Sequence, residues 1–328
     1  MRIRILGAGF YGCHLGLALK RAGMDVEIHE IAPHIFAGAS GGIPARLHLG
    51  APHYPRSLAT RQACMIHNAD FMAEYGFLTR AVPINIYAIA SDKSLIDFGT
   101  YKQIMAGVEF MTVHDPAEFG LRNVEGAIQV AERHIVTDMA REYFEAELAD
   151  VLRLNTAPGD VDSDEWDYTI DCTFCANDSA GVDRYEPCLV VLMQGATDQA
   201  VTIMDGPFGS LYPWDEAKRL CSLSSALWTP FSKTCKTWAE ARELLDGLSP
   251  DTIATQICEM RESMAYFYPA VRGYATADYR LSIRAMPLSG ADTRLVDVVR
   301  VGERALRVRA GKIDAIIAAE KMIREMIE

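Results

Sequence analysis

The sequence predicts an α/β fold in which a nucleotide-binding domain with a parallel sheet is interrupted by an inserted domain with an antiparallel sheet. Three observations support this: a strand, glycine loop and helix at the start of the chain, closely spaced apolar runs in its second half, and a glycine before a helix near its end. Because the nucleotide-binding signals recur along the chain, that domain is expected to be discontinuous. We assign residues 1–78, 124–179 and 270–328 to it, and residues 79–123 and 180–269 to a substrate domain.

The composition is that of an acidic globular protein. The 328 residues are 50% hydrophobic and 23% charged, and 32 basic against 44 acidic residues give a formal net charge of −12. Such a surface repels phosphates, which argues against nucleic acid or an anionic membrane as a partner but still permits a local pocket for a small anion. No apolar run is long enough to cross a membrane, and the eight scattered cysteines are typical of reduced thiols. We therefore expect a cytoplasmic protein with a small-molecule substrate, while the oligomeric state leaves no signal.

The first thirty residues have the layout of a βαβ dinucleotide-binding unit. A strand over residues 2–6 leads into a G-x-G-x-x-G loop at residues 7–12 and a helix that stops near Gly23. A second strand over residues 25–29 follows, with Glu30 at its end. The glycine pattern alone is a weak signal. Because a strand precedes it and a helix, a second strand and an acidic residue follow it, the segment indicates a nucleotide-binding site.

Each residue type in this loop has a physical role. Gly7 permits the tight turn, Gly9 lets the backbone approach a pyrophosphate, and Gly12 lets the helix pack close to the strand. Phe10 and Tyr11 open the helix, whose unpaired N–H groups attract phosphate. Glu30 can accept both hydroxyls of an adenosine ribose, and its charge disfavours the 2′-phosphate of NADP.

A second segment favours FAD over NAD. Residues 39–50 read ASGGIPARLHLG, so small residues precede an arginine. Small side chains let the backbone approach a second, extended part of a cofactor, and an arginine binds phosphate through two parallel hydrogen bonds. The candidate cofactor residues of this segment are Ser40, Gly41, Gly42, Arg46 and Leu47. For Arg46, contact with pyrophosphate or flavin and simple solvation at the surface both remain open.

With these residues the chain resembles the D-amino-acid oxidase-like family of FAD-dependent oxidoreductases. The resemblance rests on GAGFYG with Glu30, on GASGG-x-x-AR-x-HLG, and on Ala310-Gly311-Lys312 before a helix. It implies a Rossmann-like FAD-binding domain, FAD as the cofactor, and hydride transfer from the substrate to flavin N5.

The resemblance also implies three further cofactor contacts. A strand near Val161 would lie on the adenine side, and the backbone at Cys172 and Thr173 would pass the cofactor. The helix after Gly311, Lys312 and Ile313 would point its N-terminus at the pyrimidine end of the isoalloxazine, where its dipole stabilises negative charge on reduced flavin.

The remaining apolar patterns predict elements that complete the two domains. In the first of these helices, Leu58, Met65, Ala69 and Met72 are expected to form the buried stripe. Helices are expected over residues 57–75, 138–148, 240–248, 253–268 and from 311 onward, and strands over 83–90, 167–173, 187–194, 200–204, 208–212, 220–228, 278–287, 295–301 and 305–308.

Three residues are candidates for catalysis. Arg284 lies near the position where the resembled family has an arginine before a proline, although Ala285 and Met286 intervene here, and it is our hypothesis for a substrate anion clamp. His48 could contact the flavin or carry it covalently, and Tyr54 could line the active site or fix its loop.

Other patterns favour ordinary packing. Cys172 and Cys175 form a C-x-x-C without a second pair of metal ligands, so neither zinc nor a redox dithiol is expected. Aromatic residues of the middle region are interpreted as sheet packing rather than a cover for flavin: Phe208, Tyr212, Trp214 and Trp228.

The preferred function is an FAD-dependent oxidase or dehydrogenase acting on a small amine, amino acid or hydroxylated compound. The alternatives are a flavin-dependent sugar-nucleotide mutase without net redox change and, less favoured, an NAD-dependent dehydrogenase.

Overall fold

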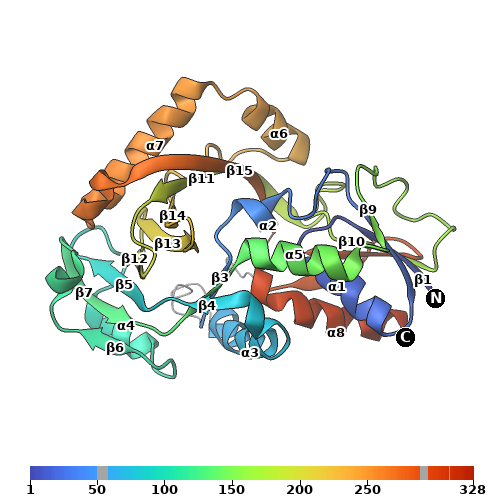
Figure 1. Cartoon of the computed structure of the whole chain (residues 1–328), viewed down its shortest axis with the longest axis horizontal. Coiled ribbons are helices and arrows are strands. Elements are labelled where there is room, and N and C mark those ends of the chain that lie inside the picture. The colour runs from blue at the N-terminus through green and yellow to red at the C-terminus, as the bar shows by residue number, and fades with distance from the viewer. Residues whose placement is uncertain (50–57, 289–294, 310) are drawn as a thin grey trace.

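Two large sheets and one small sheet organise the computed structural model, which describes residues 1–49, 58–288, 295–309 and 311–328. The six-stranded sheet and the helices on it form one end of the molecule, and the eight-stranded sheet forms the other (Figure 1). Both chain termini lie at the end of the six-stranded sheet (Figure 1). The α/β fold predicted from the sequence is confirmed.

The six-stranded sheet has the order β16-β17-β10-β1-β2-β9 and is parallel except for the β16–β17 pair. It draws on both ends and the middle of the chain, as the recurring sequence signals predict. Its strands are β1 (Arg2–Leu6), β2 (Asp25–His29), β9 (Leu152–Arg153), β10 (Tyr168–Asp171), β16 (Asp297–Arg300) and β17 (Ala305–Arg309).

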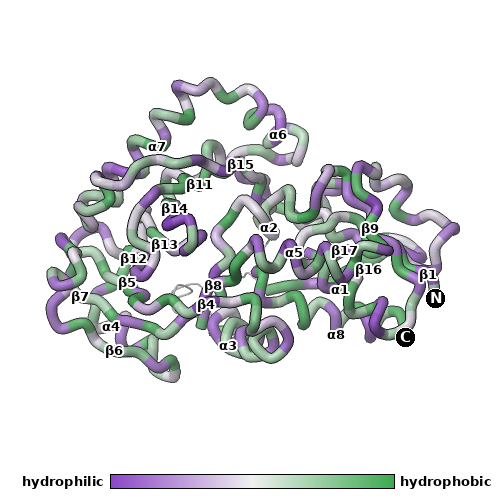
Figure 2. The backbone as a smooth tube through the Cα atoms, viewed as in Figure 1, coloured by the Kyte–Doolittle hydropathy of each residue, from purple (hydrophilic) through white to green (hydrophobic). Residues whose placement is uncertain are grey.

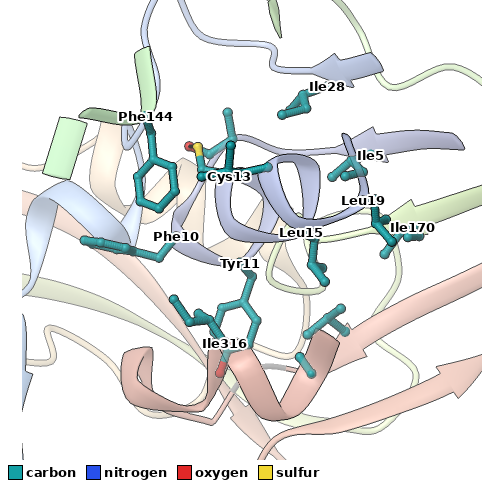
Figure 3. Packing of buried hydrophobic residues seen from close by; sticks show 14 of the residues in the cluster. Ile5, Phe10, Tyr11, Cys13, Leu15, Leu19, Ile28, Phe144, Ile170 and Ile316 are labelled. Atoms are coloured by element: carbon teal, nitrogen blue, oxygen red, sulfur yellow. Dashed lines mark hydrogen bonds between the residues drawn. The ribbon is translucent and has the colours of Figure 1, made fainter. Parts of the chain in front are cut away.

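Helix α1 (Phe10–Arg21) joins β1 to β2 and confirms the predicted βαβ unit. Its apolar side chains pack against the sheet on one side and against α5 (Thr137–Leu148) and α8 (Ile316–Ile327) on the others. Figure 3 shows this core, with Ile5, Ile28 and Ile170 around α1. Each fully buried aliphatic side chain of this kind stabilises the fold by about 1.5–3 kcal/mol.

The eight-stranded sheet has the order β15-β11-β14-β13-β12-β5-β7-β6, and its pairs are antiparallel except for β12–β5. The long strands β11 and β15 pair along nearly their whole length, from Val182 opposite Pro287 to Gln194 opposite Ala275. The strands are β5 (Ile84–Ala90), β6 (Met111–Val113), β7 (Val124–Gln129), β11 (Val182–Gln194), β12 (Gln199–Met204), β13 (Gly209–Asp215), β14 (Leu220–Ser225) and β15 (Ala275–Pro287).

Two strands lie in a different sheet from the one that the sequence-based domain boundaries imply. Strands β7 and β15 fall in the ranges 124–179 and 270–328 assigned to the nucleotide-binding domain, yet both pair within the eight-stranded sheet. Backbone pairing with β5 and β11 decides their place, and this partner choice is not encoded by local apolar pattern. The two-domain division remains our proposal, with these strands moved to the substrate domain.

The other elements bridge or cover these sheets. A small sheet of β3 (Arg46–Leu47), β8 (Arg133–Ile135) and β4 (Thr79–Ala81) lies between the two large ones. Helices α6 and α7 arch over β11 and β15 (Figure 1), and the mixed green and purple of α7 in Figure 2 fits one buried and one exposed face. The remaining helical segments are α2 (Ala39–Gly42), α3 (Leu58–Tyr75), α4 (Phe98–Ile104), α6 (Trp238–Asp246), α7 (Pro250–Ala265), η2 (Gly76–Leu78), η3 (Pro116–Phe119), η4 (Pro269–Gly273) and η5 (Ile313–Ala315).

Helix α3 buries a different face from the predicted one. Leu58 and Met65 are exposed, whereas Cys64, Phe71 and Tyr75 are buried. The helix is rotated because Phe71 and Tyr75 join the aromatic cluster next to α1 and α5. None of the helices in the described segments is long and apolar enough to cross a membrane.

A buried polar contact connects three helices. His14 on α1 lies with Nε2 3.0 Å from Glu320 Oε2 on α8 and with Nδ1 2.7 Å from the Tyr75 hydroxyl on α3. The hydrogen bond from His14, helped by Arg324 and opposed by burial, lowers the pKa of Glu320 to about 2. The ionised carboxylate therefore holds α8 against α1.

We expect Glu320→Gln to lower the free energy of unfolding by about 2 kcal/mol at pH 7, because a hydrogen bond to a charged group is lost. The folded pKa of Glu320 lies below its ordinary value near 4.5. Its stabilisation is therefore present above pH 4.5 and is lost as the pH falls toward 2. Urea unfolding between pH 3 and 7 measures this, and the gap to the unsubstituted protein should narrow at the acid end.

Glu325→Gln, on the exposed face of the same helix, is the control and should change the free energy of unfolding by less than about 0.5 kcal/mol. Equal effects of the two substitutions at pH 7 would contradict the assigned role of Glu320.

Candidate active site

A cavity of about 1140 Å³ runs from the β1–α1 loop to the eight-stranded sheet. Its lining includes residues from the carboxyl ends of β1, β2 and β10, from α2 and β3, and from β11, β15 and α6. In parallel sheets, ligands bind beyond the carboxyl ends of the strands, so the cavity lies where the βαβ unit predicts a site. Most of the predicted site residues line it: Gly7, Gly9, Phe10, Tyr11, Glu30, Ser40, Arg46, His48, Cys172, Thr173, Arg284, Gly311, Lys312 and Ile313.

The glycines of the first loop are required by close backbone contacts. A Cβ at Gly12 would overlap the carbonyl oxygen of Gly7. Gly7 has a φ of +91°, which side chains rarely adopt, and its own Cβ position would lie 3.0 Å from the carbonyl oxygen of Cys172. Gly12 is therefore a packing residue outside the cavity lining, while Gly7 and Gly9 present backbone to the cavity.

The N-terminus of α1 is built to receive an anion. Its N-cap, Gly9, makes no side-chain cap, and the first turn contains no acidic residue. The Ser40 hydroxyl of α2 accepts a hydrogen bond from Phe10 N at 3.0 Å, so the second predicted segment directly contacts the first. The partial positive charge of the helix end thus faces the cavity without an acidic residue in its own first turn, which suits a pyrophosphate.

Glu30 connects the end of β2 to the loop. Its Oε2 accepts a hydrogen bond from Ala8 N at 2.7 Å, and its Oε1 accepts one from Ala32 N at 2.9 Å. A carboxylate has about four acceptor positions, so both oxygens can still accept hydroxyls from a ribose. Glu30 therefore holds the loop in shape and remains suited to the role predicted for it.

Four more predicted cofactor residues lie outside the cavity lining, and three of them pack against protein. A Cβ at Gly41 would overlap the Phe36 carbonyl oxygen, and Gly42 faces Ser282 of β15. Leu47 is fully buried in the core, on the opposite side of β3 from Arg46, which lines the cavity. Val161 lies beyond β9, and Thr156 and Pro158 line the cavity in its place.

The end of β10 is fixed by a buried ion pair that the sequence did not indicate. Asp171 is fully buried and accepts hydrogen bonds from Thr173 N at 2.9 Å and Arg307 Nε at 3.0 Å. The loop that follows places Phe174 at a φ of 59°, and this side chain also lines the cavity. Burial raises the pKa of Cys172 and of Cys175, and both thiols are free, which agrees with the expectation of inert cysteines.

The segment before α8 closes the cavity from the other side. Gly311, Lys312 and Ile313 line it, and Tyr11 donates a hydrogen bond of 2.5 Å to the carbonyl oxygen of Lys312. Asp314 beneath them is 1% exposed, and neither carboxyl oxygen has a hydrogen-bond partner in the described part of the chain. Burial raises the pKa of Asp314, which favours the neutral acid beside this helix end.

Arg46 is the cavity arginine best placed to bind an anion. Its guanidinium lies 4.3 Å from the ring centre of Tyr212 and 3.4 Å from Thr202 Oγ1, and no described carboxylate pairs with it. Burial lowers the pKa of Arg46, because no neighbouring charge fully compensates the loss of water. The charge is therefore available to a ligand of the cavity.

Arg284 already has an internal partner. It lies opposite Glu186 in the β11–β15 ladder and donates to Glu186 Oε2 through Nε at 3.1 Å and Nη2 at 2.5 Å. Arg184 binds the other oxygen of Glu186 at 2.8 Å. Burial raises the pKa of Glu186, but the charges and hydrogen bonds of the two arginines outweigh it and leave the pKa lowered. A substrate anion at Arg284 would have to compete with this carboxylate.

The remaining predictions concern Tyr54, the aromatic residues of the middle region and metal ligands. Tyr54 lies outside the described residues. Phe208, Tyr212, Trp214 and Trp228 do not line the cavity, so the packing interpretation is supported; Trp238 of α6, which the sequence did not single out, does line it. Within the described residues, no group of three or more His, Cys, Asp and Glu side chains could hold a metal.

Comparisons with curated proteins find flavin enzymes, although no protein-family model matches the chain. The FAD-dependent monooxygenase FPY4 of Fusarium mangiferae is 35% identical over 338 residues, covering 99% of this chain and 90% of that protein. The FAD-dependent monooxygenase kojA of Aspergillus flavus is 27% identical over 312 residues, covering 82% of this chain and 72% of that protein.

Solved structures with the same fold include amino acid oxidases and a dehydrogenase. Glycine oxidase from Geobacillus kaustophilus superposes with a TM-score of 0.70 at 14% identity, covering 99% of this chain and 94% of that chain. L-proline dehydrogenase from P. horikoshii gives a TM-score of 0.67 at 12% identity, covering 99% and 92%. At these identities the likeness concerns the fold alone.

We expect Gly12→Ala to lower the free energy of unfolding by about 3 kcal/mol, because the new methyl group must displace the Gly7 carbonyl and hence the α1 end. Gly273→Ala is the control, since a Cβ there meets no atom within 4 Å. Thermal unfolding of both variants measures the difference. A Gly12→Ala protein that melts like the Gly273→Ala protein would show that the close approach is not required.

Proposed function

The chain belongs to the family of FAD-dependent monooxygenases that includes FPY4, and from this premise we propose that the protein, an FAD-dependent oxidoreductase, oxidises a small amine, amino acid or hydroxylated compound in the cavity described above. The observation that carries the proposal is the continuity of this cavity. One end is formed by the dinucleotide loop and Glu30, and the other by Arg46, His48 and the eight-stranded sheet.

The residues of the cavity fit FAD. The uncapped start of α1 would receive the pyrophosphate, Glu30 the adenosine ribose, and the segment of Gly311, Lys312 and Ile313 the flavin. Pockets for a single small ligand usually measure about 300–1000 Å³, so this larger cavity has room for a dinucleotide and a small substrate. When bound, FAD supplies a two-electron acceptor.

The chain's own residues would orient the substrate. Arg46 of β3 and His48 just after this strand both line the cavity. We assign Arg46 to an anionic group of a ligand, because its guanidinium has no carboxylate partner among the described residues. His48 would hold or accept a proton, since imidazole changes its protonation state near neutral pH.

Direct oxidation with hydride transfer to flavin N5 is the mechanism we favour. The fold shared with glycine oxidase and L-proline dehydrogenase supports it and supports placing the chain among D-amino-acid oxidase-like proteins. Monooxygenation is the second candidate, because FPY4 and kojA are both named as monooxygenases. A sugar-nucleotide mutase and an NAD-dependent dehydrogenase are not favoured by these relatives.

We expect the purified protein to contain FAD and one class of compound to bleach its visible absorbance without air. The test is an anaerobic panel of amines, amino acids and hydroxylated compounds, each added alone and then with NADH or NADPH. Direct oxidation requires bleaching by the compound alone. Bleaching only with the nicotinamide, followed by incorporation of oxygen from air, would replace it with monooxygenation, and a protein that neither contains nor takes up FAD would overturn both.

The two cavity arginines should respond differently to replacement. Arg46→Met should raise KM for an acidic substrate about 10- to 100-fold, as expected for the loss of a charged hydrogen bond. Arg284→Met should instead lower the free energy of unfolding by about 2 kcal/mol, because it removes one of the two cations that neutralise buried Glu186. Steady-state kinetics and urea unfolding measure both effects; a rise in KM confined to Arg284→Met would make Arg284 the anion clamp.

A further inference from the structure

Glu132 is a fully buried carboxylate that no sequence pattern indicated. It lies in the short turn between β7 and β8, where the eight-stranded sheet meets the small sheet. Its side chain is 0% exposed and does not line the cavity. A buried carboxylate at a junction of two sheets is costly unless donors surround it, so the groups that contact it define its role.

Four donors surround Glu132, and one of them belongs to the cavity. Leu49 N donates to Oε1 at 2.6 Å, and Asn85 Nδ2 donates to Oε2 at 3.1 Å. The Tyr87 hydroxyl and His48 Nδ1 also contact Oε2, at 2.5 and 3.3 Å. Asn85 and Tyr87 are two residues apart in β5, so their side chains point to the same side of the strand. Glu132 lies on that side. The carboxylate thus ties the cavity residue His48 to the rigid strand β5.

The contacts with Glu132 and Tyr87 favour a proton on Nδ1 of His48. The Tyr87 hydroxyl has one hydrogen, and its short contact with Glu132 uses it. The longer contact of 3.4 Å between Tyr87 Oη and His48 Nδ1 therefore cannot take the same hydrogen. An ionised Glu132 can only accept at Oε2, and Nδ1 is then the donor of the His48–Glu132 hydrogen bond.

We propose that Glu132 is a positioning residue that holds His48 with its proton on Nδ1, so that Nε2 accepts the proton which an O–H or N–H group of the substrate loses on oxidation. The inference rests on the proposed function. The substrate O–H or N–H bond breaks and an N–H bond forms at Nε2. The C–H hydrogen leaves with two electrons to FAD as the oxidant, and a C=O or C=N bond forms. The imidazolium is stabilised by the negative charge of Glu132.

Burial and hydrogen bonding act on Glu132 in opposite directions. Burial raises the pKa of Glu132, and the hydrogen bonds from Tyr87, Leu49 and Asn85 together with the charge of Lys312 reduce that rise without reversing it. Among the described residues, five other titratable groups interact electrostatically with Glu132: Arg46, Tyr212, Cys64, Tyr101 and Asp314. The cations Arg46 and Lys312 favour the carboxylate of Glu132, whereas a charge on Asp314 favours the neutral acid.

The tautomer of His48 can be read directly by NMR. The protein with bound FAD is labelled with ¹⁵N-histidine, and the ring correlations of His48 are assigned by their loss in His48→Gln. A ring nitrogen without a proton resonates far downfield of one with a proton. We expect Nδ1 of His48 to carry the proton, and we expect Glu132→Gln to shift His48 toward the other tautomer or a mixture of both.

Two variants control for general disturbance of the site. Glu186→Gln replaces an equally buried carboxylate at the other end of the cavity that binds arginines, and it should leave the His48 resonances in place. Tyr87→Phe removes a donor to Glu132 and the long contact with His48 but leaves the His48–Glu132 hydrogen bond, and it should preserve the Nδ1 proton. Thermal unfolding of each variant with FAD bound reports whether it is folded.

A proton on Nε2 of His48 in the unsubstituted protein would overturn the proposal, even if Glu132→Gln failed to fold. Unchanged His48 resonances in a folded Glu132→Gln variant would overturn it as well. Failure of the proposed function has a different signature, because it would appear as a protein without FAD or without a reducing substrate, whatever the tautomer of His48.

Discussion

The close approach of α1 to the β1 turn determines most of the remaining architecture. The space between Gly12 and the Gly7 carbonyl admits no side chain, so the helix starts directly behind the loop. This contact directs the helix end into the cavity and seats the apolar face of α1 on β1 and β2 (Figure 3). Glu30 then holds the loop from β2, and Ser40 holds it from α2. Residues that are distant in sequence are therefore positioned by one backbone contact.

The sequence predicted the elements of the nucleotide-binding half well, because the signals that define a helix or a strand are local. Strand β2 and helix α5 were predicted to within one residue, since alternation and helix-stop signals operate over short distances. The faces and partners of elements were harder to predict. The buried face of α3 depends on an aromatic cluster formed with other helices, and the place of β7 and β15 depends on strand pairing.

The residues of the candidate site also fall into two groups, those that a local motif predicts and those that only the folded structure brings together. Gly7, Gly9 and Glu30 belong to a motif whose spacing reflects contact with a nucleotide, so they were recognised at once. Glu132, Asp171 and Asp314 stand in short turns or at element ends and acquire their importance only through burial by distant segments. Gly41 and Gly42, predicted as cofactor residues, pack against Phe36 and Ser282 and do not line the cavity, because small residues also occur where two protein segments pack closely. Burial of a charge is a property of the assembled fold and leaves no pattern in a single sequence.

The six-stranded sheet has a consequence for how the protein is made. Its central strands β1 and β10 are synthesised in the first 171 residues, but β10 receives its outer partner β17 only when residues 305–309 have emerged. A nascent chain therefore presents an open, apolar strand edge throughout the synthesis of β11 to β15. Parallel pairing across such a long separation is intrinsically slow. The strand that completes the cofactor half of the cavity is thus synthesised after every strand of the eight-stranded sheet, and until then the open edge of β10 is a site of possible edge-to-edge aggregation.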